Sequence, residues 1–145
     1  MRWPEPRPGL VIRYAYLWRR EAVAGRDEGV KDRPCAIVVA VKSEAGATTV
    51  YALPITHTPP HSADEGIELP AATKARLGLD EARSWIVLTE ANIFAWPGPD
   101  LRFVKGQGLE SAAYGMLPPK LMALVRQRFA RLLQARRAGT IKRAE

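Results

Sequence analysis

An arginine and a threonine stand at the ends of two apolar segments that follow each other in the chain. Arg33 directly precedes a proline and the apolar run 35–41, and Thr56 ends the next β-type segment, 48–56. If the two segments pair as a hairpin, the start of the first lies beside the end of the second, and Arg33 and Thr56 become neighbours. A guanidinium fork beside a hydroxyl can bind the oxygens of a phosphate. A structural ion pair between Arg33 and Glu90 is an equally good interpretation of the same arginine.

The histidines and the cysteine offer fewer possibilities for chemistry. His57 and His61 are the two histidines of the chain, and the prolines between them prevent the helix that a His-x-x-x-His zinc site needs. His57 follows a strand end and could act as an acid or base near neutral pH. Cys35 lies inside an apolar run, where a thiol is inert. The glycine-containing stretches match no phosphate-binding loop, so we expect neither a metal nor a nucleotide cofactor.

The excess positive charge is concentrated toward the C-terminus. The chain of 145 residues has a net charge of +7. Residues 111–145 account for the whole excess, because eight lysines and arginines stand there against Glu145 alone, whereas residues 1–110 are balanced. Two interpretations remain open: a solvated helix face with a frayed tail, or a surface that contacts nucleic-acid phosphates or an acidic partner.

Short apolar segments with proline- and glycine-rich connections predict the elements that must position these side chains. Strands are expected at 10–18, 35–41, 48–56, 67–70, 84–96 and 101–104. A short helix is expected at 71–78, and an amphipathic helix over about 118–138 has apolar residues at 121, 124, 125, 129, 132 and 133. Exposed loops are expected at 19–32 and 57–66, a linker at 105–115 and a basic tail at 139–145.

These elements predict one mostly β domain of the α+β class over residues 1–145. A small barrel over about 8–105 would be closed by the C-terminal amphipathic helix. The N-terminus lacks the apolar stretch of a signal peptide, and no segment reaches membrane-spanning length. We therefore expect a cytoplasmic protein with no membrane partner.

Five segments of the sequence carry a resemblance to a known family: "PGLVIRYAYLW", "RPCAIVVAV", "YALPIT", "WIVLTEANIF" and "LPPKLMALVRQRFARLL". In this order, over about residues 8–133, they resemble the MazF/PemK toxin family of bacterial toxin–antitoxin systems. The resemblance implies an SH3-like barrel, usually a homodimer, and an acidic antitoxin protein as partner. It also implies a metal-independent endoribonuclease that cuts single-stranded RNA in a sequence-dependent way, leaving a 2′,3′-cyclic phosphate and a 5′-hydroxyl.

The resemblance also assigns roles to individual residues. Arg33 would stabilise the phosphorane and donate a proton, and Thr56 would orient the phosphate. Supporting roles are predicted for His57, Glu90 and Asp32, of which Asp32 would hold the guanidinium. Separately from the resemblance, the charge and the two glycines of the loop 19–32 indicate a mobile lid over the groove, and its basic residues are predicted to bind RNA: Arg19, Arg20, Arg26 and Lys31.

Two positions depart from the family pattern. His57 stands where members often have a serine, which adds a candidate base. Leu88 stands where some members carry an arginine shortly before the acidic residue, here Glu90, so that catalytic variant is absent. The alternative function is that of a catalytically inactive family member that binds protein or nucleic acid.

Overall fold

The chain folds into a mostly β structure with a few helices, as the sequence predicts. The computed structural model describes residues 3–26, 29, 31–104 and 111–143. Its strands are β1 (Leu10–Tyr14), β2 (Arg33–Lys42), β3 (Thr48–Thr56), β4 (Gly66–Glu68), β5 (Trp85–Val87), β6 (Glu90–Trp96), β7 (Leu101–Arg102), β8 (Ala113–Met116) and β9 (Gly139–Lys142). Its helices are α1 (Arg19–Val23), α2 (Ala71–Leu77), α3 (Pro119–Gln134) and the short 3-10 helix η1 (Ala63–Glu65).

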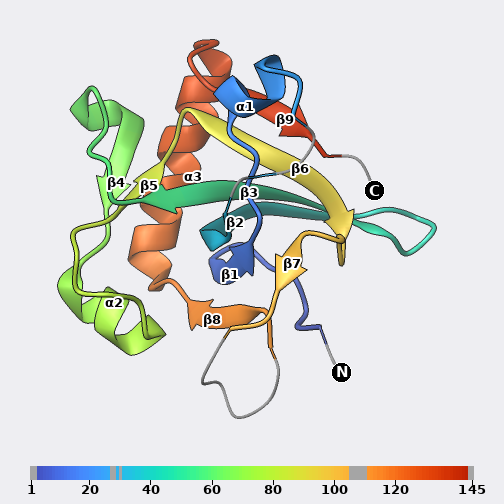
Figure 1. Cartoon of the computed structure of the whole chain (residues 1–145), viewed down its shortest axis with the longest axis horizontal. Coiled ribbons are helices and arrows are strands. Elements are labelled where there is room, and N and C mark those ends of the chain that lie inside the picture. The colour runs from blue at the N-terminus through green and yellow to red at the C-terminus, as the bar shows by residue number, and fades with distance from the viewer. Residues whose placement is uncertain (1–2, 27–28, 30, 105–110, 144–145) are drawn as a thin grey trace.

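The described strands form one sheet, with α3 packed across one face of it (Figure 1). The strand order is β4-β5-β3-β2-β1-β7, with β6 beside β3, β8 beside β1 and β9 beside β6. All ladders are antiparallel except the one between β6 and β9. Within the described residues these ladders do not close the sheet into a barrel, so the closed SH3-like form stays a prediction.

The β2–β3 hairpin is the longest ladder, and its register shifts by one residue at an irregularity between Ile37 and Val39. Cys35 pairs with Pro54 and Lys42 with Thr48, and a turn around Gly46, at a φ of 90°, joins the strands. The other flank of β3 pairs with β6 up to Ala52 and with β5 from Ile55 onward. Pro54 lies between these two partners, where its missing amide hydrogen interrupts no ladder on that flank.

The core lies on both faces of β2, as the continuous apolar run at residues 35–41 indicates. Ala36 and Val38 pack in a cluster that contains the buried face of α3, including Phe129. Cys35 and Ile37 point to a second cluster, made with residues of β1, β3 and β6. Because successive strand residues alternate between faces, a continuous apolar run serves both clusters.

The amphipathic helix is also present and somewhat shorter than predicted. Proline at its start suits the first helical turn, which needs no amide donor. Its buried side chains are Met122, Val125, Phe129 and Leu132, a stripe with helical spacing. Leu133, which the pattern places on the same stripe, is 36% exposed.

Two N-terminal segments differ from the predictions. The sequence predicts a strand over 10–18, but β1 ends at Tyr14. Beyond it the Leu17 amide donates to the Asn92 side chain at 2.9 Å, and the Leu17 carbonyl accepts from the same side chain at 2.8 Å. The loop predicted at 19–32 begins with α1, whose start is fixed because Glu21 accepts a hydrogen bond from the Trp18 amide at 3.0 Å.

Two C-terminal segments also differ. The predicted basic tail contains β9, which pairs with β6 in parallel, and it includes a buried Arg143. The Arg143 guanidinium pairs with Asp100 at 3.0 Å and donates to the Ala15 carbonyl at 2.8 Å. The predicted linker 105–115 ends in β8, while its residues 105–110 lie outside the described residues. Among the described helices, none is long and apolar enough to cross a membrane.

Candidate active site

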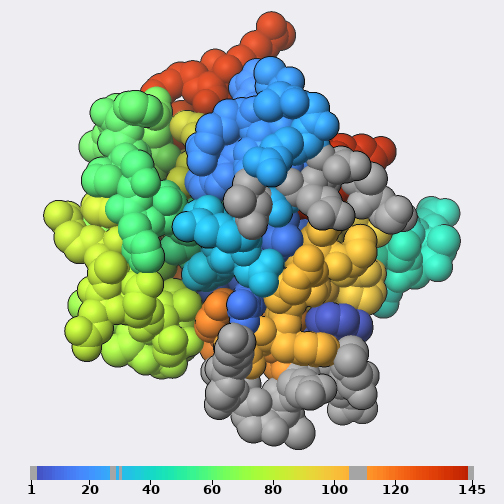
Figure 2. Space-filling model, viewed as in Figure 1, coloured from blue at the N-terminus to red at the C-terminus, as the bar shows by residue number. Residues whose placement is uncertain are grey.

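A groove of about 750 Å³ runs along the ends of the central strands, and the predicted catalytic residues line it. Its walls come from β2, β3 and β6, from the segment after β3, and from the connection between α2 and β5. Figure 2 views the molecule from the side on which the 57–66 segment (green) lies next to α1 (blue). Of the predicted site residues, the following line the groove: Arg20, Lys31, Asp32, Arg33, Thr56, His57 and Glu90. The lining does not include Arg19 and Arg26.

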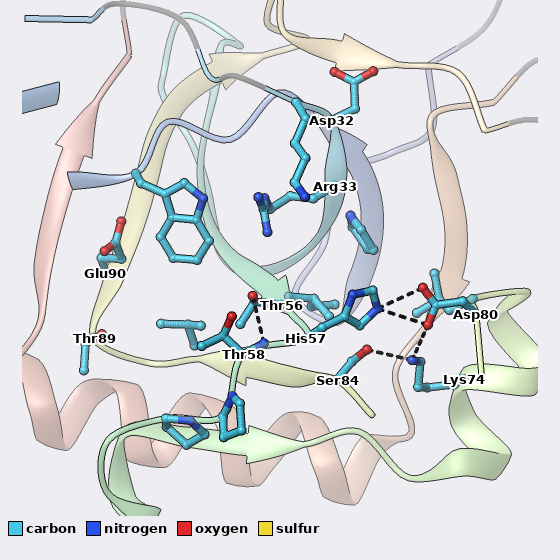
Figure 3. Close-up of a pocket in the computed structure, with 18 of the residues that line it drawn as sticks. Asp32, Arg33, Thr56, His57, Thr58, Lys74, Asp80, Ser84, Thr89 and Glu90 are labelled. Carbon is cyan, nitrogen blue, oxygen red and sulfur yellow. Dashed lines mark hydrogen bonds and ion pairs between the residues drawn. The ribbon is translucent and has the colours of Figure 1, made fainter. Parts of the chain in front are cut away.

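The expected pairing of Arg33 with Thr56 follows from the hairpin register. Continuing the ladder two residues beyond Cys35 and Pro54 brings Arg33 opposite Thr56. Figure 3 shows both residues in the middle of the groove, with Glu90 on one side and His57 on the other. The Thr56 hydroxyl oxygen accepts a hydrogen bond from the Thr58 amide at 3.2 Å, which leaves the hydroxyl hydrogen available as a donor.

Arg33 is half-buried and is held by an aromatic ring rather than by a carboxylate. Its guanidinium carbon lies 4.9 Å from the centre of the Trp18 ring, and that of Arg20 lies at the same distance. Among the described residues, the buried Nε of Arg33 and the buried Nε1 of Trp18 have no hydrogen-bond partner. Burial lowers the pKa of Arg33 from its ordinary value. The groove therefore contains a cation with at least one unsatisfied donor.

Both carboxylates predicted to support Arg33 have other partners. Glu90 accepts hydrogen bonds from the Tyr16 hydroxyl at 3.0 Å and from the Arg19 amide at 2.9 Å. The structure therefore does not form the alternative Arg33–Glu90 ion pair. The prediction that Asp32 holds the Arg33 guanidinium is wrong, because Asp32 pairs with Arg13 and with Arg102, each at 3.5 Å.

Tyr16 and Cys35 are nearby groups whose ionisation burial suppresses. Burial and the neighbouring Glu90 raise the pKa of the Tyr16 hydroxyl, which keeps it a hydrogen-bond donor to that carboxylate. Burial raises the pKa of the fully buried Cys35 thiol. Cys35 therefore packs as a small apolar side chain, as the sequence predicts.

His57 takes part in a cluster that the sequence does not reveal. Its Nε2 lies 2.9 Å from one oxygen of Asp80 and 3.1 Å from the other. The same carboxylate accepts a hydrogen bond from the Lys74 ammonium at 2.8 Å, which lowers the pKa of Asp80 (Figure 3). Lys74 also donates to the Ser84 hydroxyl at 2.6 Å. Only the glycine that ends α2, Gly78, points to this region in the sequence, because it predicts the turn that presents Asp80.

His61 and the carboxylates of the groove do not assemble a cation site. His61 lines the groove, but within the described chain no three histidine, cysteine or acidic side chains gather closely enough to hold a metal ion.

The basic C-terminal segment is partly engaged inside the molecule. Arg137 pairs with Asp64 at 2.7 Å and with Glu65 at 3.4 Å, and thereby joins the segment that follows α3 to η1. The hydrogen bond from Arg137 lowers the pKa of Asp64 to about 2. With Arg143 buried in the core, these two arginines serve the fold, and the remaining basic residues of the segment keep both interpretations of its charge open.

No family model, no curated protein and no solved structure matches the chain. The resemblance to the MazF/PemK toxins therefore rests on the sequence segments quoted above.

Proposed function

We propose that the protein is a metal-independent endoribonuclease of the MazF/PemK kind, the toxin of a toxin–antitoxin pair. The observation that carries the proposal is the groove, in which Arg33 and Thr56 meet at the open end of the β2–β3 hairpin. A phosphodiester placed between them would meet a guanidinium and a hydroxyl donor. The proposal includes the SH3-like barrel, the homodimer, the acidic antitoxin and the cytoplasmic location that the resemblance implies.

The reaction needs three contributions from the protein. The ribose 2′-oxygen attacks the adjacent phosphorus, and the bond from phosphorus to the 5′-oxygen breaks, so that a 2′,3′-cyclic phosphate and a 5′-hydroxyl form. One group must accept the proton of the 2′-hydroxyl, one must stabilise the crowded dianionic phosphorane, and one must supply a proton to the leaving oxygen. Arg33 is suited to the second contribution and can assist the third, while the Thr56 hydroxyl orients the phosphate.

His57 is suited to the first contribution because Asp80 fixes its tautomer. An ionised carboxylate can only accept hydrogen bonds, so the imidazole Nε2 that faces Asp80 carries the hydrogen. In the neutral ring this leaves Nδ1 with a lone pair, which is the proton acceptor that a general base requires. The interaction with Lys74 keeps Asp80 ionised, since it lowers the pKa of that carboxyl.

The RNA strand would be held by the cations of the same groove. Arg20 and Lys31 line it beside Arg33, whereas Arg19 and Arg26 contribute from outside the lining. Contacts of this kind release counterions from the backbone, so binding should weaken as salt is added.

The deciding experiment is cleavage of single-stranded RNA by the purified protein in the presence of EDTA. We expect products with a 5′-hydroxyl, which a polynucleotide kinase labels directly, and a 2′,3′-cyclic phosphate. Arg33→Ala and Thr56→Val should lose cleavage while the circular dichroism spectrum stays unchanged. Arg126→Ala is the matched control, because Arg126 is exposed on α3 and does not line the groove.

Three outcomes would count against the nuclease. Absence of cleavage with retained RNA or protein binding would identify the inactive binding module instead. Activity that EDTA abolishes would contradict the metal-independent reaction and direct attention to His57 and His61. Equal losses of cleavage activity in Arg33→Ala and Arg126→Ala would show that the reaction depends on the overall positive charge of the protein and not on the groove.

A further inference from the structure

Lys74 is a buried lysine whose ammonium is fully occupied at the wall of the groove. Its side chain is 6% exposed, on the face of α2 that also buries Thr73 and Leu77. The ammonium donates to Asp80 at 2.8 Å, to the Ser84 hydroxyl at 2.6 Å and to the Ala82 carbonyl. An ammonium has three N–H donors, and these three acceptors use all of them. Lys74 therefore has no donor left for a phosphate.

The two groups beyond Lys74 are exposed and would be loosely held without it. The side chains of His57 and Asp80 are 59% and 57% exposed. An ion pair between two exposed side chains is weak, because water screens the charges and both side chains lose rotamer freedom on pairing. Lys74 restricts this pair, because its buried ammonium holds one oxygen of the Asp80 carboxylate.

We propose that Lys74 is a positioning residue for the proposed ribonuclease, which fixes Asp80 so that Asp80 holds the His57 ring with Nδ1 as the proton acceptor. This inference rests on the function proposed above and adds the source of the histidine's orientation. The order of the contacts is Lys74 to Asp80 to His57, from a buried helix residue to the open groove (Figure 3). Proton transfer from the ribose 2′-hydroxyl requires that the Nδ1 lone pair of His57 is oriented toward it when the RNA is bound.

The charged environment of His57 comes from several elements and must be kept constant in the test. The groove is also lined by titratable or charged side chains from β2, β6, β8, η1, α1 and the adjoining loops: Arg20, Lys31, Asp32, Arg33, His61, Glu65, Glu90 and Tyr114. Substitution of Lys74 leaves all of these in place. A change seen at His57 then reports the loss of the anchor.

The experiment combines the tautomer of His57 with the kinetics of RNA cleavage. Long-range proton–nitrogen spectra of protein labelled at histidine nitrogen distinguish Nε2–H from Nδ1–H in the neutral ring, and His61→Gln assigns the signals. Wild type should show the Nε2–H tautomer at His57. Lys74→Met should show a mixture of tautomers and a kcat lower by about 10- to 100-fold with little change in KM, the size of effect that misplacing a reacting group causes. Lys120→Met, an exposed lysine on α3, is the control and should match wild type in both measurements.

A second variant keeps the test decisive if Lys74→Met does not fold. Asp80→Asn changes an exposed position, and its amide can donate to Nε2, so the ring should shift to the Nδ1–H form and kcat should fall. Unchanged tautomer and kcat in either folded variant would overturn the positioning role. A lower kcat with the wild-type tautomer would overturn it as well, because it would show a merely structural effect. If wild type has the Nε2–H ring but cleaves no RNA, the proposed function fails, although the anchoring of His57 stands.

Discussion

Arg33→Met is the substitution that best distinguishes a functional role of Arg33 from a structural one. In wild type the buried Nε of Arg33 has no partner among the described residues, and the guanidinium lies 4.9 Å from the Trp18 ring centre. Methionine keeps most of the apolar stem of the side chain and removes both the charge and the unsatisfied donor. The protein should therefore lose function without losing its fold.

The expected change in stability follows from two opposing effects. An unsatisfied buried donor costs about 1–3 kcal/mol, and its removal stabilises the fold by that amount. Loss of the cation–π contact with Trp18 removes about 0.5–1 kcal/mol of stabilisation at a partly exposed site. The difference predicts that Arg33→Met is more stable than wild type by about 1 kcal/mol. A gain in stability together with a loss of cleavage would indicate that Arg33 serves function at a cost to the fold.

Urea unfolding followed by circular dichroism measures this change. With a urea dependence of about 2 kcal/mol/M, the midpoint should rise by about 0.5 M. Ile37→Ala, at a fully buried position of the same strand, is the contrasting variant and should be less stable by about 2–5 kcal/mol. A variant Arg33→Met that is less stable than wild type by more than about 1 kcal/mol would refute the reasoning, because the arginine would then be a structural residue.

Three further predictions concern the groove and its supports. His57→Ala should lower kcat by about 10²–10⁴-fold, as single-turnover cleavage of RNA would measure. Arg143→Met should cost about 3–5 kcal/mol in urea unfolding, because it leaves the mostly buried Asp100 carboxylate without its partner. Since the pKa of Asp64 is lowered to about 2, its pairing with Arg137 stabilises the fold above the ordinary carboxyl pKa and is lost as the pH falls through about 2. Arg137→Ala should therefore make stability less dependent on pH between about 4 and 2, and an unchanged dependence would show that the ion pair contributes nothing.

The parts of the fold that follow from local patterns could be predicted from the sequence. The apolar run 35–41 and the segment 48–56 have the composition of strands, and the short turn between them predicts a hairpin that brings Arg33 close to Thr56. The exact pairing also depends on an irregularity between Ile37 and Val39, which shifts the register by one residue and does not follow from the sequence pattern. The stripe that contains Val125 and Phe129 likewise identifies α3. In each case the signal lies within about twenty consecutive residues, where periodicity decides the structure.

The parts that depend on distant contacts could not be predicted. β9 is a short polar strand that exists because β6 offers it an edge, and Arg143 is buried because Asp100 lies within 3.0 Å of it. A run of basic residues contains no information about such a partner. The burial of Lys74 could not be predicted either, because a lysine on a short helix is usually solvated. Only the folded loop brings Asp80 to it. The sequence therefore identifies the half of the groove that contains Arg33 and Thr56. It does not identify the half that contains Lys74 and Asp80.

The two halves of the groove differ in how their cations are satisfied, and this difference predicts how a phosphodiester would lie. The Lys74 ammonium has acceptors for all three donors, so a phosphate near it would gain no new hydrogen bond. Arg33 lies over the Trp18 ring and has no carboxylate partner among the described residues, so an anion that reaches its guanidinium meets little competition. The phosphate should therefore lie at Arg33 and Thr56, with the 2′-hydroxyl toward His57. In this orientation Arg33→Met should reduce the dependence of RNA binding on salt, whereas Lys74→Met should leave that dependence unchanged while cleavage slows. A reduced salt dependence of RNA binding in Lys74→Met would show that the lysine contacts the phosphate, and it would contradict this orientation of the strand.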